Sequence, residues 1–293
     1  MREIRPHSRL RRADKKSQTK LILGALFLIG VMILFWYNLK DYKKEESQKM
    51  FSNTDYIPAP NHGVIYSKPN FTLSYVEKYE LPEFVAYRLT VDMMNQKKFP
   101  RDQDFDPDPA IKENSAHYHD YKNSGYRRGH LVPSADMAWD KQSMNATFLL
   151  SNVAPMREEF NDGPWLELEH NVRDWSRKYK NIMVVAGPVF RDSLSTIGSN
   201  DVLVPRYYYK AVFKVEVKRP EVIGFLFDQT LSNNARLENF IVPIDSIEKV
   251  TGLDLFSNMY GSWDEEIRLE KQNKRSEGQW SFSEKWYLKR IDN

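Results

Sequence analysis

Hydrophobic and polar positions along the chain predict both strands and helices. Four segments rich in β-branched and aromatic residues predict strands: residues 72–91, 182–190, 207–217 and 222–229. Three segments are spaced as helices, in whole or in part: residues 143–155, 165–180 and 245–253. Strands and helices are interspersed without a regular strand–helix–strand rhythm. This order favours an α+β fold with a largely antiparallel sheet.

The apolar segment 21–39 has a different pattern, because it contains no charged residue. As a helix rising about 1.5 Å per residue it would be roughly 28 Å long, close to the hydrocarbon thickness of about 30 Å. Trp36 and Tyr37 stand near its end, where an aromatic belt would lie. We therefore expect one N-terminal transmembrane helix in addition to the α+β domain.

The flanking residues indicate an uncleaved signal anchor. A cleaved signal peptide has a shorter apolar region followed by small residues, and neither is present. A core helix with no polar face would be unusual. Eight basic residues precede the segment and four follow closely. By the positive-inside rule the N-terminus stays in the cytoplasm and the remainder crosses the membrane.

These patterns divide the chain into four parts. We expect a basic cytoplasmic tail at 1–20, the anchor at 21–39, a tether at 40–54 and one folded domain at 55–293. A bacterial inner membrane, with the domain in the periplasm, fits this order best. The alternative is the mitochondrial inner membrane, although Glu3 and Asp14 are unusual in a transit peptide.

Composition narrows the class of protein. Hydrophobic residues make up 41% of the 293 positions, which excludes wholesale disorder. The absence of cysteine excludes disulfides, thiolate metal sites and a cysteine nucleophile. Residues 1–50 hold twelve Lys or Arg and five Asp or Glu, a net charge of +7, while the remainder holds 31 and 35, a net charge of −4. Any nucleic-acid surface on the domain must therefore be a local patch.

Residues with the chemistry of phosphodiester cleavage are concentrated between Gly125 and Arg173. A neutral histidine can take a proton from water near pH 7. Asparagine and glutamate oxygens suit Mg²⁺, and arginines bind phosphate oxygens. Glu169 and Arg173 are four residues apart, so one helix face presents both. The candidate residues of this stretch are Arg128, His130, Asn152, Asn161, Glu169 and Arg173.

The motifs of this stretch resemble one enzyme family. RGHLVPSADM, TFLLSNVAP, and FN followed by WLELE are similar to the DNA/RNA non-specific endonucleases, the ββα-metal, endonuclease G-like nucleases. VVAGPVF, VPRYYYKAVF and LENFIVPIDSIEKVTGLDLF extend the resemblance, which covers about Tyr56 to Met259. It implies the ββα-metal nuclease fold: a central antiparallel sheet flanked by helices, with the ββα motif on one side.

The resemblance also implies roles for individual residues. His130 would be the general base, Asn161 the single protein ligand of Mg²⁺ (with Mn²⁺ as an alternative), and Glu169 would hold the metal's water shell. Arg173 and Arg128 would steady the phosphate, and Asn152 would orient the site. Arg101 would be an upstream phosphate-binding arginine, although a solvated arginine in an acidic loop fits the pattern equally well. DNA and RNA are the implied substrates, with 5′-phosphate products, and homodimers occur in the family.

One departure from the family pattern keeps a second interpretation open. Arg127 occupies the position before Arg128 that is usually Asp. The alternative function is a catalytically weakened relative that serves as a nucleic-acid-binding or interaction module. A third hypothesis, a phosphodiesterase for small esters, would require a closed pocket.

Other polar clusters have simpler explanations. His117 and His119 could bind a transition metal, but no third ligand is evident. Trp165 and Trp175 are expected in the core, and Asp136 is expected to cap or pack. Six cations could form the local basic strip or only a solvated face: Arg177, Lys178, Lys180, Arg206, Lys210 and Lys214.

Overall fold

The computed structural model describes residues 20, 22–38, 54–101, 103–112, 115–215, 220–231, 235–260, 266, 268 and 280–291. The chain divides into two compact units, Met1–Ser52 and Asn53–Asn293. The two units are described separately.

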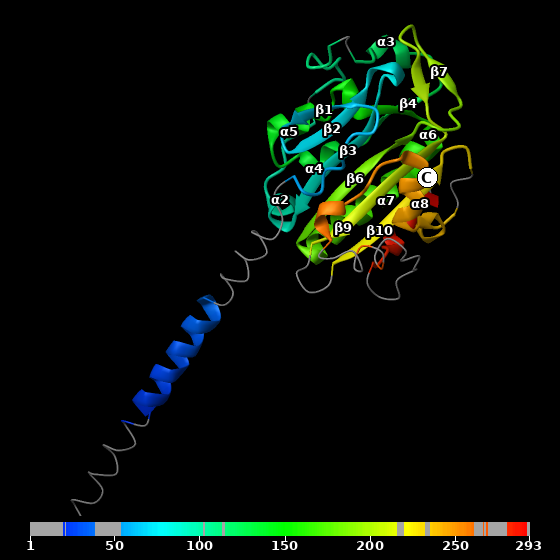
Figure 1. Cartoon of the computed structure of the whole chain (residues 1–293). Helices are drawn as coiled ribbons and strands as arrows, with labels where there is room; N and C mark the ends of the chain where they lie inside the picture. Colours follow the sequence, from blue (N-terminus) through cyan, green and yellow to red (C-terminus); the bar gives the residue numbers. More distant parts are fainter. Residues whose placement is uncertain are drawn as a thin grey trace, which may run out of the picture. The chain divides into compact units, whose positions relative to one another are not determined.

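The first unit contains one described helix, over residues 22–38, drawn in blue in Figure 1. Its large apolar side chains are exposed. Within the described part of the chain, no helix is long and apolar enough to cross a membrane. Leu21, Leu39 and residues 1–19 and 40–53 lie outside the described residues. The predicted transmembrane helix over 21–39 is therefore not confirmed.

The second unit is built on a seven-stranded sheet. Every neighbouring pair of its strands is antiparallel, which confirms the predicted sheet type. The strands, in spatial order, are β1 (Val64–Lys68), β2 (Phe71–Val76), β3 (Leu81–Thr90), β6 (Asn181–Val189), β9 (Tyr207–Lys214), β10 (Glu221–Asp228) and β11 (Ile241–Val242).

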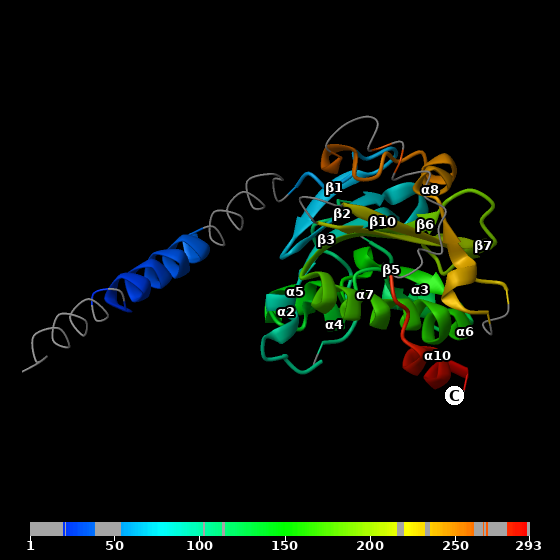
Figure 2. The same ribbon diagram turned by 90° about the horizontal axis from the view of Figure 1, so that it is seen from below.

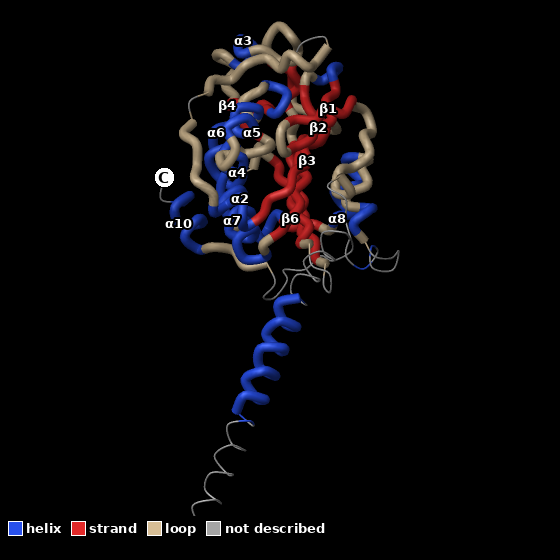
Figure 3. Tube along the Cα trace, turned by 90° about the vertical axis from the view of Figure 1, so that its left-hand side faces the viewer, coloured by secondary structure: helices blue, strands red, loops and turns tan. Residues whose placement is uncertain are grey.

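Helices cover both faces of this sheet (Figures 2 and 3). One face carries α2 (Val91–Asn95), α4 (Ser134–Met137), α5 (Lys141–Ala146) and α7 (Leu166–Tyr179), and the other carries α8 (Ile244–Thr251). With both faces covered, the central strands β3 and β6 are buried along nearly their whole length. This explains why β6 is a continuous apolar run in the sequence rather than an alternating one.

The predicted strand over 72–91 is in fact a hairpin. A single turn of 3₁₀ helix, η1 (Glu77–Tyr79), separates β2 from β3. Glu80 closes the turn in the left-handed region with φ 53°, and its N–H donates to the carbonyl of Glu77. The remaining short elements are α3 (Tyr118–Tyr121), β7 (Ser195–Ile197), β8 (Val202–Val204), η4 (Leu237–Phe240) and η5 (Ser257–Met259).

A ββα unit lies beside the main sheet. β4 (Arg127–His130) pairs antiparallel with β5 (Val153–Met156), and the chain then passes through α6 (Glu158–Phe160) and the π-helical turn η3 (Asn161–Trp165) into α7. The helix predicted over 143–155 is wrong beyond Ala146: the 3₁₀ turn η2 (Leu150–Asn152) and β5 follow. Pro155 lacks an N–H group and disfavours helical geometry at Ala154, so this end of the segment is extended.

A buried ion pair joins α7 to its neighbours. Arg173 Nη1 lies 2.7 Å from Asp136 Oδ1. The hydroxyl of Tyr87, on β3, donates to Asp136 Oδ2 at 2.9 Å. All three side chains are buried. Burial alone would lower the pKa of Arg173, but Asp136 and Glu169 outweigh it and raise that pKa.

The C-terminal segment covers another side of α7. The ring of Trp286, on α10 (Glu284–Ile291), stacks on His170 with centroids 3.8 Å apart. Its indole N–H donates to Asp174 at 2.8 Å, and the N–H of Ser283 donates to Asn171 at 2.9 Å. Packing therefore fixes α7 on two sides.

The substitution Asp136→Ala should be severely destabilising, because it removes the nearer counter-ion of the buried Arg173 and leaves only the longer contact with Glu169, at 4.0 Å. We expect the free energy of unfolding to fall by about 3–5 kcal/mol. Urea denaturation followed by tryptophan fluorescence measures this change. The matched control is Arg177→Ala on the same helix, which breaks the exposed Arg177–Asp174 pair and should cost less than about 1 kcal/mol. Equally small losses for both variants would contradict the role given to the buried pair.

Candidate active site

His130 stands where three elements of the ββα unit meet. It is the last residue of β4 and pairs with Val153 of β5. A side chain at Gly129 would overlap the side chain of Met156, so the glycine leaves room for this methionine to pack across β4. From the third element, Trp165 Nε1 donates to the carbonyl of His130 at 3.0 Å. The backbone of His130 is therefore fixed by strand pairing and by η3.

Asn152 holds the chain just after His130. Its side-chain oxygen accepts from the N–H of Val132 at 3.0 Å, and its amide nitrogen donates to the carbonyls of Val132 at 3.0 Å and Thr147 at 2.9 Å. The side chain is fully buried. Both ends of the amide therefore bond the backbone on either side of the motif, and the role of Asn152 in orienting the site stays a prediction.

Aromatic rings enclose the His130 imidazole. The ring centroids of Phe105 and Phe148 each lie 5.0 Å from that of His130. An arginine lies over each of these rings: Arg101 is 4.8 Å from the centre of Phe148, and Arg128 is 4.7 Å from the centre of Phe105. The Nε2 atom of His130 is buried and has no hydrogen-bond partner within the described part of the protein.

This environment keeps His130 neutral. Burial, followed by the positive charges of Arg101 and Arg128, lowers the pKa of His130 to about 3. The imidazole is therefore uncharged near pH 7. A neutral imidazole with an unoccupied Nε2 can accept a proton from a ligand that reaches it.

Asn161 and Glu169 offer oxygen donors on the segment that follows β5. The Asn161 amide nitrogen donates to Asp162 at 2.6 Å, which leaves the amide oxygen as the end that can bind a cation. Glu169 is buried, and burial raises its pKa to about 7 against the lowering effects of Lys210 and Arg173. Amide and carboxylate oxygens suit a hard cation such as Mg²⁺.

The oxygens of Asn161 and Glu169 can be compared with the ligands that metal ions require. No group of three or more His, Asp or Glu residues in the described ranges could hold a metal ion. Mg²⁺ commonly binds through one or two protein oxygens and keeps several of its waters. Asn161 and Glu169 fit an ion of this kind.

Arg173 lies apart from the other candidate arginines. Its Nη1 contacts Asp136 and its Nη2 lies 3.0 Å from His170 Nδ1. The i,i+4 contact with Glu169 forms as expected, at 4.0 Å. The structure therefore brings Arg101, Arg128 and His130 together and places Arg173 in a buried network. Direct contact between Arg173 and phosphate stays a prediction.

Arg127 points away from the His130 side of β4. Successive side chains of a strand alternate between its faces, so Arg127 lies opposite to Arg128 and His130. Its exposed guanidinium forms an ion pair with Glu158, which raises the pKa of Arg127. The departure from the family pattern thus leaves the imidazole and its aromatic neighbours untouched.

The basic strip considered from the sequence is only partly available. Lys210 is fully buried, with its Nζ 4.0 Å from the centre of the Trp165 ring, so it cannot contribute to a surface. Arg206 pairs with Asp228, and Lys214 with Glu221. Trp165 and Trp175 are buried in the core, as predicted.

The sequence interpretation missed the residues that surround His130. Phe105 lies in the acidic loop considered only for Arg101, and Phe148 lies inside the TFLLSN motif that directed attention to Asn152. An aromatic residue in a polar loop was the available signal for Phe105. The role of Asp136 as counter-ion to Arg173 had no local signal, because 37 residues separate the two.

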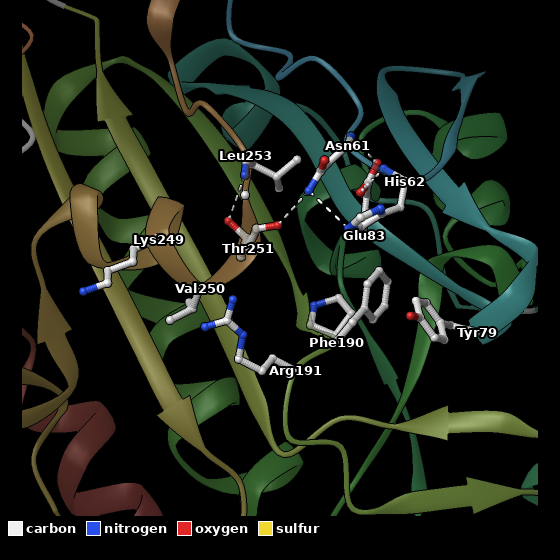
Figure 4. A pocket seen from close by; sticks show the side chains of 12 residues that line it. Asn61, His62, Tyr79, Glu83, Phe190, Arg191, Lys249, Val250, Thr251 and Leu253 are labelled. Atoms are coloured by element: carbon white, nitrogen blue, oxygen red, sulfur yellow. Dashed lines mark hydrogen bonds between the residues drawn. The ribbon is translucent and has the colours of Figure 1, made fainter.

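A separate pocket of about 310 Å³ lies at the end of α8, with the loop before β1 and the loop after β6 (Figure 4). The Glu83 carboxylate at its edge accepts backbone N–H groups of Asn61, His62 and Gly63. None of the predicted site residues lines this pocket. It therefore gives no support to the small-ester phosphodiesterase hypothesis.

The chain is similar to known nucleases in sequence and in fold. The chain is 31% identical over 197 residues to "Nuclease 1, mitochondrial" of Schizosaccharomyces pombe, covering 61% of each protein. It is 30% identical over 221 residues to human "Endonuclease G, mitochondrial", covering 68% of this chain and 72% of the relative. A crystal structure of EndoG in complex with EndoGI superposes with a TM-score of 0.64 at 28% identity, covering 68% of this chain and 88% of that one.

The family itself is identified by a match over most of the folded unit. The model described as DNA/RNA non-specific endonuclease matches residues 51–262, which include β4, β5, η3 and α7. The chain therefore belongs to the DNA/RNA non-specific endonuclease family.

Proposed function

We propose that this protein is a metal-dependent endonuclease that hydrolyses phosphodiester bonds of both DNA and RNA. The observation that carries the proposal is the buried, unpartnered Nε2 of His130, with Arg101 and Arg128 beside its aromatic neighbours. A neutral base next to two cations suits a reaction in which water attacks an anionic phosphate. Membership of the nuclease family and the names of its relatives support the same conclusion.

In this mechanism His130 Nε2 accepts a proton from a water molecule that attacks phosphorus. The bond between phosphorus and the 3′-oxygen breaks, and that oxygen takes a proton from a solvent water molecule, so one product has a 5′-phosphate and the other a 3′-hydroxyl. Arg101 and Arg128 bind non-bridging phosphate oxygens and stabilise the negative charge that develops there. Little sequence preference follows, because contacts with phosphate do not read bases.

Asn161 and Glu169 would hold Mg²⁺, or Mn²⁺ in its place, Asn161 directly and Glu169 through water. When bound, the cation supplies positive charge for the phosphate and the leaving oxygen. The buried pair of Arg173 and Asp136 keeps Glu169 in place on α7.

The alternative function is a weakened relative that binds nucleic acid or a partner without cleaving. Arg127 in place of the usual Asp favours this alternative. The orientation of Arg127 away from His130, toward Glu158, favours the enzyme. The family resemblance also allows a homodimer.

A further part of the proposal concerns location. The uncharged segment 21–39, with exposed apolar side chains on its described helix, supports attachment to a membrane. The bacterial inner membrane, with the nuclease domain in the periplasm, remains one candidate. The names of the mitochondrial relatives support the other, the mitochondrial inner membrane.

The first prediction concerns cleavage. The full chain should cut supercoiled plasmid and single-stranded RNA with Mg²⁺, and chelation by EDTA should abolish both activities. His130→Ala should lower the rate by about 10²–10⁴-fold, the usual contribution of a general base. Arg177→Ala, on the exposed side of α7, serves as the control and should cut normally. A folded wild-type chain that binds but does not cut with Mg²⁺ or Mn²⁺ would establish the alternative function.

The second prediction concerns pH. The lowered pKa keeps the His130 base neutral until the pH is far below the ordinary histidine value of about 6.5. At low pH, protonation of His130 should cause kcat/KM to fall. We therefore expect the midpoint of this fall to lie well below pH 6.5. The profile of Glu169→Gln, measured in parallel, identifies any limb due to that carboxyl, whose pKa burial raises to about 7. A His130-dependent limb at pH 6.5 or above would disprove the assignment.

The third prediction concerns attachment to the membrane. The full chain should stay in the membrane pellet after alkaline carbonate extraction, and a chain lacking residues 21–39 should move to the supernatant. Equal extraction of both chains would disprove the anchor.

A further inference from the structure

Beyond His130, the contacts of Arg128 lead to an exposed aromatic side chain. The Arg128 guanidinium carbon lies 4.7 Å from the centre of the Phe105 ring and 5.0 Å from the centre of the Tyr118 ring. Phe105 is the ring that packs against His130. His130, Phe105, Arg128 and Tyr118 therefore form a continuous row of contacts from the partly buried imidazole to solvent.

Two histidines extend this row. The His119 ring meets the Tyr118 ring edge-on, with centroids 5.6 Å apart. The His117 ring stacks on His119 at 5.0 Å, with the two planes 13° apart. All three rings are exposed, Tyr118 by 42%. We call Arg128, Tyr118, His119 and His117 the stacking surface.

The turn that carries these rings is anchored from inside. Asp120, buried in α3, accepts the backbone N–H of His117 at 2.7 Å and the side-chain N–H of Asn200 at 2.8 Å. A pocket of about 470 Å³ adjoins it, with His117, His119, Ser199 and Asn200 among its lining residues. Exposed rings on an anchored turn lose little conformational freedom when a ligand binds.

The chemistry of the stacking surface matches one class of ligand. Nucleic-acid bases stack on aromatic rings, and arginine binds the phosphates between them. Bases in a duplex are covered on both faces by their neighbours. Unpaired bases can turn outward and present a face to a protein ring.

We propose that the stacking surface binds unpaired bases of a nucleic-acid strand, next to the phosphate held by Arg128, and makes single-stranded nucleic acid the preferred substrate. This inference rests on the proposed nuclease function and names the substrate class of the same site. Tyr118 contacts Arg128, so its ring would stack with the base next to the phosphate that Arg128 binds.

Binding by the full chain tests this proposal without cleavage. The probes are a fluorescent single-stranded oligonucleotide and a duplex of the same sequence, in EDTA and again with the His130→Ala chain in Mg²⁺. Tyr118→Ala should weaken single-strand binding by about 5- to 150-fold, the effect of losing one base–aromatic stack. Duplex binding should change by less than about twofold. Tyr118→Phe, which keeps the ring, should restore wild-type affinity.

A base-deletion cycle distinguishes stacking from a general structural effect. Each oligonucleotide of a series lacks one base, at a different position. For one of these positions, the wild-type protein should bind the abasic strand as weakly as Tyr118→Ala binds the intact strand. The same abasic position should add nothing further in Tyr118→Ala. The matched control is Tyr207→Ala, which removes the ring beneath Arg206, a side chain already paired with Asp228. This variant should bind both probes normally.

Three results would overturn the proposal: unchanged single-strand binding by Tyr118→Ala, equal losses for single strand and duplex, or additive effects of the abasic position. If single-strand binding by Tyr118→Ala is unchanged and the substitution disrupts a protein complex instead, the stacking surface would be assigned to a protein partner. Normal Tyr118-dependent binding by a chain that cuts nothing would refute the nuclease function while leaving the stacking surface intact.

Discussion

The arrangement of the candidate site depends on the buried contact between Arg173 and Asp136. This contact joins α7 to α4 and, through the hydroxyl of Tyr87, to the central strand β3. Taking two charges out of water is costly, so such a pair contributes less to net stability than to geometry. Glu169 lies one helical turn before Arg173, and the segment that bears Asn161 leads into the same helix. A shift of Arg173 would therefore move the oxygens of Asn161 and Glu169, which are proposed to bind a cation, relative to His130.

Arg101 and Arg128, near His130, supply positive charge in a domain whose net charge is negative. The folded part of the chain is acidic, yet its proposed substrate is a polyanion. Arg177, Arg206 and Arg236 are paired with carboxylates, which neutralise them. Arg101 and Arg128 instead lie against aromatic rings. A ring holds a guanidinium through its quadrupole and leaves the full positive charge available to phosphate. Aromatic side chains thus create a local cationic site within an acidic domain.

The elements that could be predicted are those with a local cause. β6, β9, β10, α7 and α8 follow from apolar runs or helical spacing within their own sequences. β5 could not be separated from a helix in this way, because its strand conformation depends on pairing with β4 more than twenty residues earlier. The candidate site shows the same difference between features with a local cause and features that depend on long-range packing. Residue type and the family resemblance selected His130, Asn152, Asn161 and Glu169 as candidates, whereas the packing of Phe105 and Phe148 on His130 exists only in three dimensions.

The C-terminal helix α10 lies beyond the residues that define the family, yet it packs on the helix that bears Glu169. Its contacts join residues 112 positions apart, such as Trp286 with Asp174. During synthesis on the ribosome, α7 emerges long before α10 exists, and domains fold as their parts become available. The side of α7 that carries His170, Asn171 and Asp174 stays uncovered through that interval. The packing of this helix is thus completed only when synthesis has passed Trp286, 112 residues beyond Asp174.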